Sequence, residues 1–458
     1  MSEEDRRFNI AFENLLNSDR SDYPNLVGGI QFASGLEYKA RSPLDEGILI
    51  GNFQIPEPGM VKRAVPFATE AFAVWSSLPL SLRAERMKDI RDDLVKSKNR
   101  IEAAITLSVG MTSKQSRADM DRLIEVMDGC LEEVDGMPSG ANAMGVWAVI
   151  GSYQSPVASL FANVFAALLA GNTVIMCPSH LCPLPAYIIF EMMVRRGLPD
   201  GALNLLTDPH GKTQLDLVNN PDIVGVCISG SAEDSEEMMF AQVDDELSFH
   251  SEIKGMNPAI ISQRSDLKYA AEAVLESAFS YSGQRLDSCS KVIVLDSHYE
   301  QFLNLLLKGV KDITVGDPVE EKVFTGPVIN KKKMNQFLEI MDDARSYLLY
   351  GGDRLTKGFL NDGYFVKPAI VVGLPDDHEL NNMDHSLPIL SVQRASDLDD
   401  AIEKANACEF GLSAGIFTKD EKEMEKFLAL THADSAYVNG PSLELGPALK
   451  VTLSNFMC

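Results

Sequence analysis

The 458-residue chain has little that would suit an oxidising compartment. Its seven cysteines are odd in number and scattered, and no two of them form a Cys-x-x-Cys pair. The residues that follow Met1 include no apolar run of the kind that a signal peptide requires. These absences argue against a disulfide framework and against export, and they predict a cytoplasmic protein.

Positive charge is also scarce. The chain has 41 Lys and Arg against 66 Asp and Glu, which gives a formal net charge of −25. Such a charge repels the phosphates of nucleic acids and the anionic surface of membranes, so neither is expected as a partner. Because the acidic side chains are spread among apolar, periodic segments, we interpret them as a solvated surface.

Only one apolar run approaches the length of a membrane span. Residues 157–176 are mostly apolar, and about 20 such residues can cross a bilayer. Asn163 interrupts the run, and Gly171-Asn172 is a helix stop. The sequence therefore predicts a buried helix followed by a buried strand, and no membrane span.

The apolar pattern predicts two α/β blocks. Residues 59–133 have helical spacing, with helices expected at 61–76 and 82–107. Short apolar runs then alternate with helical stretches, which is typical of a parallel sheet covered on both faces, in a Rossmann-like block. The first block is expected to contain strands at 146–150, 173–176, 202–206 and 223–228, with helices at 157–170, 184–196 and 212–219. The second block, from about 254 to 440, is expected to contain helices near 267–279, 298–311, 332–347, 397–406 and 420–430.

The strand expected at 223–228 leads into Ser229-Gly230-Ser231 and then into a helical stretch that includes Ser235. A Gly/Ser turn that opens a helix offers free backbone N–H groups to a phosphate. Any strand-to-helix turn uses the same residues, however, and the acidic pair Glu233-Asp234 argues against an anion at this place.

Several motifs occur in one order along residues 25–440 and resemble those of the NAD(P)-dependent aldehyde dehydrogenase superfamily. They are Ala170-Gly171-Asn172-Thr173-Val174, Arg196-Gly197-Leu198-Pro199, Ile228-Ser229-Gly230-Ser231, Glu252-Ile253-Lys254-Gly255-Met256-Asn257-Pro258, Gly283-Gln284-Arg285, Gly326-Pro327-Val328-Ile329, Gly363-Tyr364-Phe365 and Glu409-Phe410-Gly411-Leu412. Residues 277–291 favour the 1-pyrroline-5-carboxylate dehydrogenase branch. The resemblance implies a Rossmann-like cofactor domain (1–253), a catalytic-type α/β domain (254–440) and a short C-terminal tail (441–458).

The family forms a thioester on a cysteine and hydrolyses it with the help of a glutamate. The resemblance places that glutamate at Glu252, although the residue also suits a surface position at a strand end. The position of the cysteine, 34 residues further on, is Leu286, which has no nucleophilic atom. Cys289 is the alternative nucleophile, displaced by three residues, and Gln154 replaces the family's oxyanion-hole asparagine.

The resemblance implies NAD or NADP as cofactor, but three of the implied contacts differ. Cys177 replaces a lysine that reaches the adenosine ribose, and Ser235 replaces the second glycine of the phosphate turn. Asp384 replaces the glutamate on the nicotinamide-ribose side. The other implied contacts are Ser179, Gly230 and Ser231. Cys177, His180 and Cys182 have an unusual spacing for a metal, and none is expected.

Two segments that form oligomer contacts in the family look short here, namely residues 134–146 and the chain after Gly440. The family's tetramer contacts are therefore not expected, and a homodimer remains open. The implied ligand is a small-molecule aldehyde or a dinucleotide. Three hypotheses follow for the function: a homologue inactive in aldehyde oxidation, an active semialdehyde dehydrogenase that uses Cys289, and a thiol-free hydrolase that uses Glu252.

Overall fold

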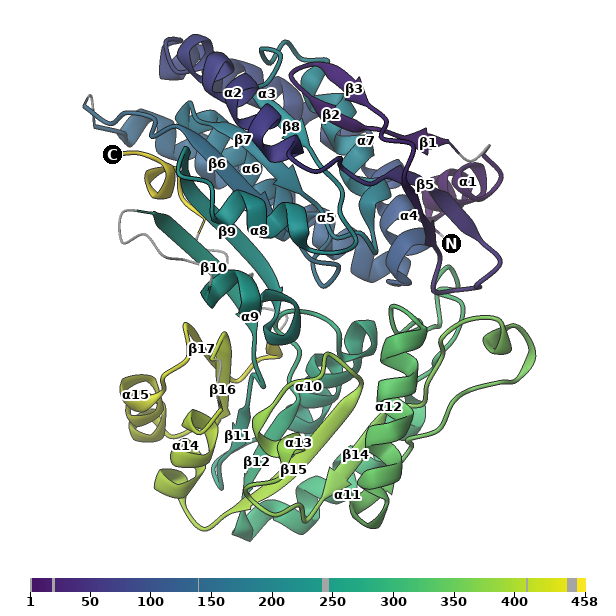
Figure 1. The fold of residues 1–458 in the computed structure, drawn as a ribbon. Helices are drawn as coiled ribbons and strands as arrows, with labels where there is room; N and C mark the ends of the chain where they lie inside the picture. Colours follow the sequence, from purple (N-terminus) through teal and green to yellow (C-terminus); the bar gives the residue numbers. More distant parts are fainter. Residues whose placement is uncertain (1, 19–20, 139, 241–246, 409–410, 443–450) are drawn as a thin grey trace.

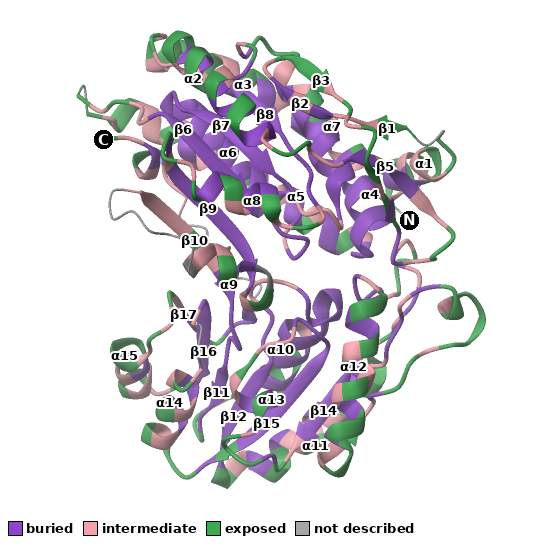
Figure 2. Cartoon of the chain, viewed as in Figure 1, coloured by how far each residue is buried: buried purple, intermediate pink, exposed green. Residues whose placement is uncertain are grey.

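The computed structural model describes all residues except 1, 19–20, 139, 241–246, 409–410 and 443–450. Figure 1 shows two bodies, one above the other, each built around a seven-stranded sheet. The strands of both sheets are mostly buried, and the outer faces of the helices are exposed (Figure 2). This arrangement confirms the α/β fold class that the alternating pattern predicts.

In the first sheet, five neighbouring strands are parallel to one another. An antiparallel pair of strands completes the sheet at one edge. In order across the sheet its strands are β10 (Ser248–Lys254), β9 (Ile223–Ser231), β6 (Val146–Ile150), β7 (Thr173–Cys177), β8 (Leu203–Leu205), β2 (Asn25–Val27) and β3 (Ile30–Phe32). A small separate sheet contains β1 (Asp22–Tyr23), β5 (Leu49–Gln54) and β4 (Glu37–Arg41).

Nine helices belong to this body in the described part of the chain. They are α1 (Glu3–Leu16), α2 (Met60–Trp75), α3 (Leu80–Lys96), α4 (Lys98–Val109), α5 (Ser113–Glu133), α6 (Ala158–Ala170), α7 (Pro183–Val194), α8 (Lys212–Val218) and α9 (Ala232–Phe240). The buried helix α6 and the strand β7 confirm the interpretation of residues 157–176, and no described helix is long and apolar enough to cross a membrane.

Two sequence predictions for this body are wrong in detail. The helix expected at 82–107 is two helices, because Ser97 leaves helical geometry with φ −98° and ψ 6° and separates α3 from α4. The turn expected at Ser229-Gly230-Ser231 is the end of β9, because β10 supplies a parallel partner as far as the pair Lys254 and Ser231. Helix α9 begins at the next residue.

The second sheet is parallel except for β13 at one edge. In order its strands are β13 (Leu348–Tyr350), β14 (Ala369–Val372), β15 (Ile389–Ala395), β12 (Lys291–Leu295), β11 (Ala259–Ile261), β16 (Ser413–Phe417) and β17 (Ser435–Val438). Its helices are α10 (Leu267–Phe279), α11 (Tyr299–Gly309), α12 (Lys331–Asp343), α13 (Glu379–Asn382), α14 (Leu398–Asn406) and α15 (Glu421–Leu430).

The end of the chain returns to the first body (Figure 1). Asn142 and Cys458 exchange two backbone hydrogen bonds of 2.9 and 3.0 Å, and the Asn172 side chain donates to the Phe456 carbonyl at 2.7 Å. The Phe456 ring packs on Trp147 at a centroid distance of 4.6 Å. Of the expected tail 441–458, residues 443–450 lie outside the described residues, as do Glu409 and Phe410 of the motif that resembles the family's.

Candidate active-site cavity

A cavity of about 530 Å³ reaches three of the residues that the sequence singled out, namely Glu252, Gln154 and Leu286. They come from β10, from the loop between β6 and α6, and from the segment before β12. The remaining wall includes Thr112, which caps the N-terminus of α5, Asp119 and Arg122 of α5, and Asp312 and Phe324 after α11. The fold thus brings together residues that are far apart in the sequence.

Leu286 reaches the cavity through a strained segment. Tyr281 and Ser282 have positive φ angles of 52° and 53°, which side-chain-bearing residues rarely adopt. Ser282 is held in place, because its backbone N–H donates to Thr325 Oγ1 and its hydroxyl donates to the Gly326 carbonyl, both at 2.7 Å. Gly283 follows with φ 68°, and a Cβ there would lie only 2.4 Å from the Leu387 carbonyl oxygen.

Asn257 fixes the other side of the same segment, a role that the sequence analysis did not assign. Its amide nitrogen donates to the carbonyls of Leu286 at 2.8 Å and Ser288 at 2.9 Å. Its amide oxygen accepts from the Ser413 N–H at 3.0 Å. Asn257 thus joins the Leu286 segment to β16, and the only signal in the sequence was its place in the Glu252–Pro258 motif.

Cys289 does not lie in this cavity. Its side chain is 1% exposed and packs in the core of the second body, and its thiol donates to the Lys291 carbonyl at 3.2 Å. Burial raises the pKa of Cys289 to about 12, against the smaller opposing effects of the Lys291 hydrogen bond and of the Lys254 charge. At neutral pH the sulfur is a protonated thiol, which is a poor nucleophile.

Glu252 is partly buried, and its Oε2 atom has no hydrogen-bond partner among the described residues. Burial raises the pKa of Glu252 to about 8, and the charge of Arg122 offsets only part of this effect. The group is therefore mostly a neutral carboxylic acid at pH 7, which can donate a hydrogen bond to a ligand. It becomes a carboxylate, and so a general base, only near pH 8 and above.

Replacing Glu252 by glutamine is expected to make the stability of the protein less dependent on pH. The folded-state pKa of about 8 lies above the unfolded value of 4.5, so the stability of the wild type is complete below pH 4.5 and falls as the pH rises through 8. Between about pH 5 and pH 9 the free energy of unfolding of the wild type should fall by about 2 kcal/mol more than that of Glu252→Gln. This figure includes a reduction for screening by water in the cavity. Urea titrations at about pH 5 and pH 9 measure this difference. Glu272→Gln, at an exposed site on α10, is the control, and parallel curves for Glu252→Gln and the wild type would contradict the expectation.

Gln154 is 1% exposed, and its orientation is fixed by its neighbours. The Ser386 hydroxyl donates to Asp384 Oδ2 at 3.1 Å, so it can only accept from the Gln154 amide nitrogen, which lies 3.2 Å away. One N–H of Gln154 is therefore used within the protein, and one remains for a ligand oxygen. The Gln154 Oε1 atom is buried without a partner among the described residues.

The predicted cofactor contacts lie around the carboxyl ends of β7 and β9, which flank β6. Cys177 ends β7 and is fully buried, which raises the pKa of its thiol, and Ser179 follows in the next loop. Gly230 and Ser231 end β9. The Ser235 hydroxyl lies 2.8 Å from the place of a Cβ on Gly230, so it fills the space beside the backbone. The described residues include no group of three His, Cys, Asp or Glu side chains that could hold a metal ion.

Asp384 forms a buried ion pair that the sequence analysis missed. Lys254 Nζ lies 2.5 Å from Asp384 Oδ1, and the two side chains are 0% and 3% exposed. Asp384 also accepts hydrogen bonds from the Ser290 hydroxyl at 2.5 Å and from the Ser386 N–H at 2.8 Å. Burial alone would raise the pKa of Asp384, but the Lys254 charge and these hydrogen bonds outweigh it, so the pKa is lowered. The signal for Lys254 was its place two residues after Glu252 on one strand, which puts both side chains on the same face.

The comparisons with known proteins agree with this architecture. The pattern of the aldehyde dehydrogenase family matches residues 33–447, so the chain belongs to that family, which confirms the resemblance noted in the sequence. The chain is 28% identical to an alpha-ketoglutaric semialdehyde dehydrogenase from Bacillus subtilis (strain 168), over 93% of this chain and 91% of that protein. It is 25% identical to a 1-pyrroline-5-carboxylate dehydrogenase from Geobacillus sp. (strain WCH70), over 94% and 88%. The structure of a 1-pyrroline-5-carboxylate dehydrogenase from Thermus with bound NAD superimposes with a TM-score of 0.92 at 22% identity, covering 100% of this chain and 96% of the other.

Proposed function

We propose that this protein keeps the ligand cavity of the aldehyde dehydrogenase family but does not oxidise aldehydes. The supporting observation is the set of side chains that line the cavity. Leu286 lines the cavity together with Glu252 and Gln154, while the sulfur of Cys289 packs in the core. A hydrocarbon side chain cannot form the covalent intermediate that a thiolate forms. The expected function is to bind a small carbonyl compound, with hydrogen bonds from Glu252 and Gln154 to its oxygen.

A direct assay tests this proposal. The purified protein is mixed with NAD or NADP and with 1-pyrroline-5-carboxylate or alpha-ketoglutaric semialdehyde, the compounds in the names of the relatives. We expect no increase in reduced cofactor above the rate without protein, while a relative assayed in parallel shows that the reagents work. Turnover of either compound by this protein would refute the proposal.

The second candidate function is a semialdehyde dehydrogenase that uses Cys289. The similarity to proteins of that name supports it, and so does the place of Cys289 three residues after Leu286. If it is right, the wild type should turn over a semialdehyde and Cys289→Ala should abolish that turnover. We expect instead that the wild type and Cys289→Ala are equally inactive, because the thiol is buried and protonated.

The family implies NAD or NADP as the cofactor, and the residues present do not fit it well. The Cys177 thiol supplies no cation, the Ser235 hydroxyl fills the space next to Gly230, and the Asp384 carboxylate is already occupied by donors of the chain itself. We propose that weak or absent dinucleotide binding accompanies the loss of the nucleophile.

A further inference from the structure

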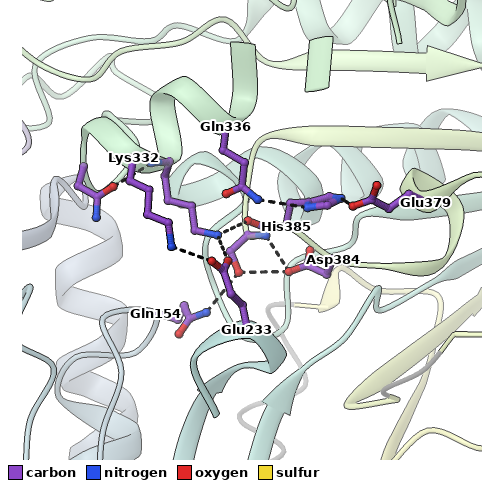
Figure 3. Close-up of polar contacts among 10 residues, drawn as sticks. Gln154, Glu233, Lys332, Gln336, Glu379, Asp384 and His385 are labelled. Carbon is purple, nitrogen blue, oxygen red and sulfur yellow. Dashed lines mark hydrogen bonds and ion pairs between the residues drawn. The ribbon is translucent and has the colours of Figure 1, made fainter. Parts of the chain in front are cut away.

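The edge of the first sheet where β9 ends carries a charged network of the chain's own side chains. Ligands of such sheets bind at the carboxyl ends of the strands, and phosphates bind at the N-terminus of the helix that follows. Here Glu233 is the second residue of α9, so its carboxylate lies at that helix N-terminus. Figure 3 shows Glu233 in contact with Lys332, which comes from α12 of the other body.

Two lysines of α12 hold the Glu233 carboxylate. Lys332 Nζ donates to Oε1 at 2.8 Å, and Lys333 Nζ donates to Oε2 at 2.9 Å. The Lys333 side chain is only 8% exposed, and it also donates to the His385 carbonyl at 3.1 Å. Burial raises the pKa of Glu233, but the two lysines outweigh it and lower the pKa to about 2, so the carboxylate stays charged.

A second pair lies further in. Lys254 and Asp384 form the buried ion pair described above. The Ser386 hydroxyl links Asp384 to Gln154, two residues that are labelled in Figure 3. Neither charge can leave without exposing the other to an apolar interior, which is strongly unfavourable. This pair is therefore harder to displace than the Glu233 contacts, since the Glu233 side chain is 46% exposed.

We propose that these two sets of ion pairs fill the dinucleotide cleft from within, and that the wild-type protein consequently binds neither NAD nor NADP. The Glu233 carboxylate takes the place of a phosphate at the start of α9 and occupies the two lysines that would otherwise attract one. The Lys254–Asp384 pair takes the place of the nicotinamide end. A dinucleotide would have to approach one carboxylate and displace a buried pair, and like charges at close range disfavour such a ligand.

The test uses ADP as a probe of the pyrophosphate end and NAD⁺ as a probe of the whole cleft, with binding measured by isothermal titration calorimetry at millimolar ligand. The wild type should bind neither ligand. Glu233→Ala should bind ADP at least about tenfold more tightly than the detection limit that the wild type sets, because Lys332 and Lys333 are released and a like charge is removed. It should bind NAD⁺ no more tightly than ADP, since the Lys254–Asp384 pair still fills the inner end.

Two control variants make each outcome decisive. Glu191→Ala removes an exposed partner of Arg195 elsewhere on the first body, and it should gain no affinity for ADP. Lys332→Ala added to Glu233→Ala should lose most of the gain. Three outcomes would each overturn the proposal. They are binding of NAD⁺ by the wild type, no gain of ADP affinity in Glu233→Ala, and much tighter binding of NAD⁺ than of ADP by that variant. Because the readout is binding alone, a failure here leaves the proposal on aldehyde oxidation standing.

Discussion

Asp384→Ala is expected to lower the free energy of unfolding by about 3–5 kcal/mol, because it leaves the Lys254 ammonium buried without a counter-charge. The two side chains are 0% and 3% exposed, so water cannot replace the missing partner. The Ser290 hydroxyl and the Ser386 N–H lose their acceptor in the same variant, which adds to the loss. Guanidinium titrations followed by circular dichroism at neutral pH measure the change.

The double variant Lys254→Met/Asp384→Leu separates the value of the pair from the cost of breaking it. Replacing both charges by apolar groups should restore most of the stability that Asp384→Ala loses. Asp342→Ala, which breaks an exposed pair with Arg345, is the surface control and should change stability by less than about 1 kcal/mol. A loss of similar size in Asp384→Ala and Asp342→Ala would contradict the expected role of burial.

Leu286→Cys is expected to create a thiol that iodoacetamide modifies at least about a hundredfold faster than Cys289, since an ordinary thiol pKa near 8.5 gives far more thiolate than a pKa of about 12. The new side chain would line the cavity of about 530 Å³ beside Glu252, where a small reagent can enter. Peptide mass spectrometry of a labelling time course gives the rate at each cysteine.

The same chain supplies the references for this experiment. Cys458 is exposed and should be labelled in both proteins, which shows that the reagent is active. Cys289 should remain unlabelled in the wild type while the protein is folded. Slow labelling of residue 286 in the variant, or fast labelling of Cys289 in the wild type, would show that the expected accessibility of the two positions is wrong.

Much of the site could be predicted from the sequence because it depends on spacing along the chain. The separation of 34 positions from Glu252 to Leu286 places a leucine where the family has its cysteine, and the structure puts both residues on one cavity. The alternation of apolar runs and helical stretches likewise predicted four parallel strands of the first sheet, β6, β7, β8 and β9, and five helices of the second body, α10, α11, α12, α14 and α15. Local patterns predict elements well because strand and helix periodicities are properties of short segments.

The contacts between distant segments could not be predicted in this way. Lys254 and Asp384 are 130 residues apart, and nothing near either residue indicates that they pair. The same is true of Glu233 and Lys333, which belong to different bodies. The sequence suggested that the acidic residues after β9 disfavour an anion, but not that lysines of α12 neutralise one of them.

The sequence by itself determined the fold class, the family and the absence of a thiol at position 286, because these depend on residue identity and order. Only the tertiary structure decided the state of the remaining groups. It buried Cys289 away from the cavity, left a Glu252 oxygen without a hydrogen-bond partner among the described residues, and paired Lys254 with Asp384. Burial and charge pairing set the protonation and reactivity of a side chain, and both depend on atoms that distant segments bring close together.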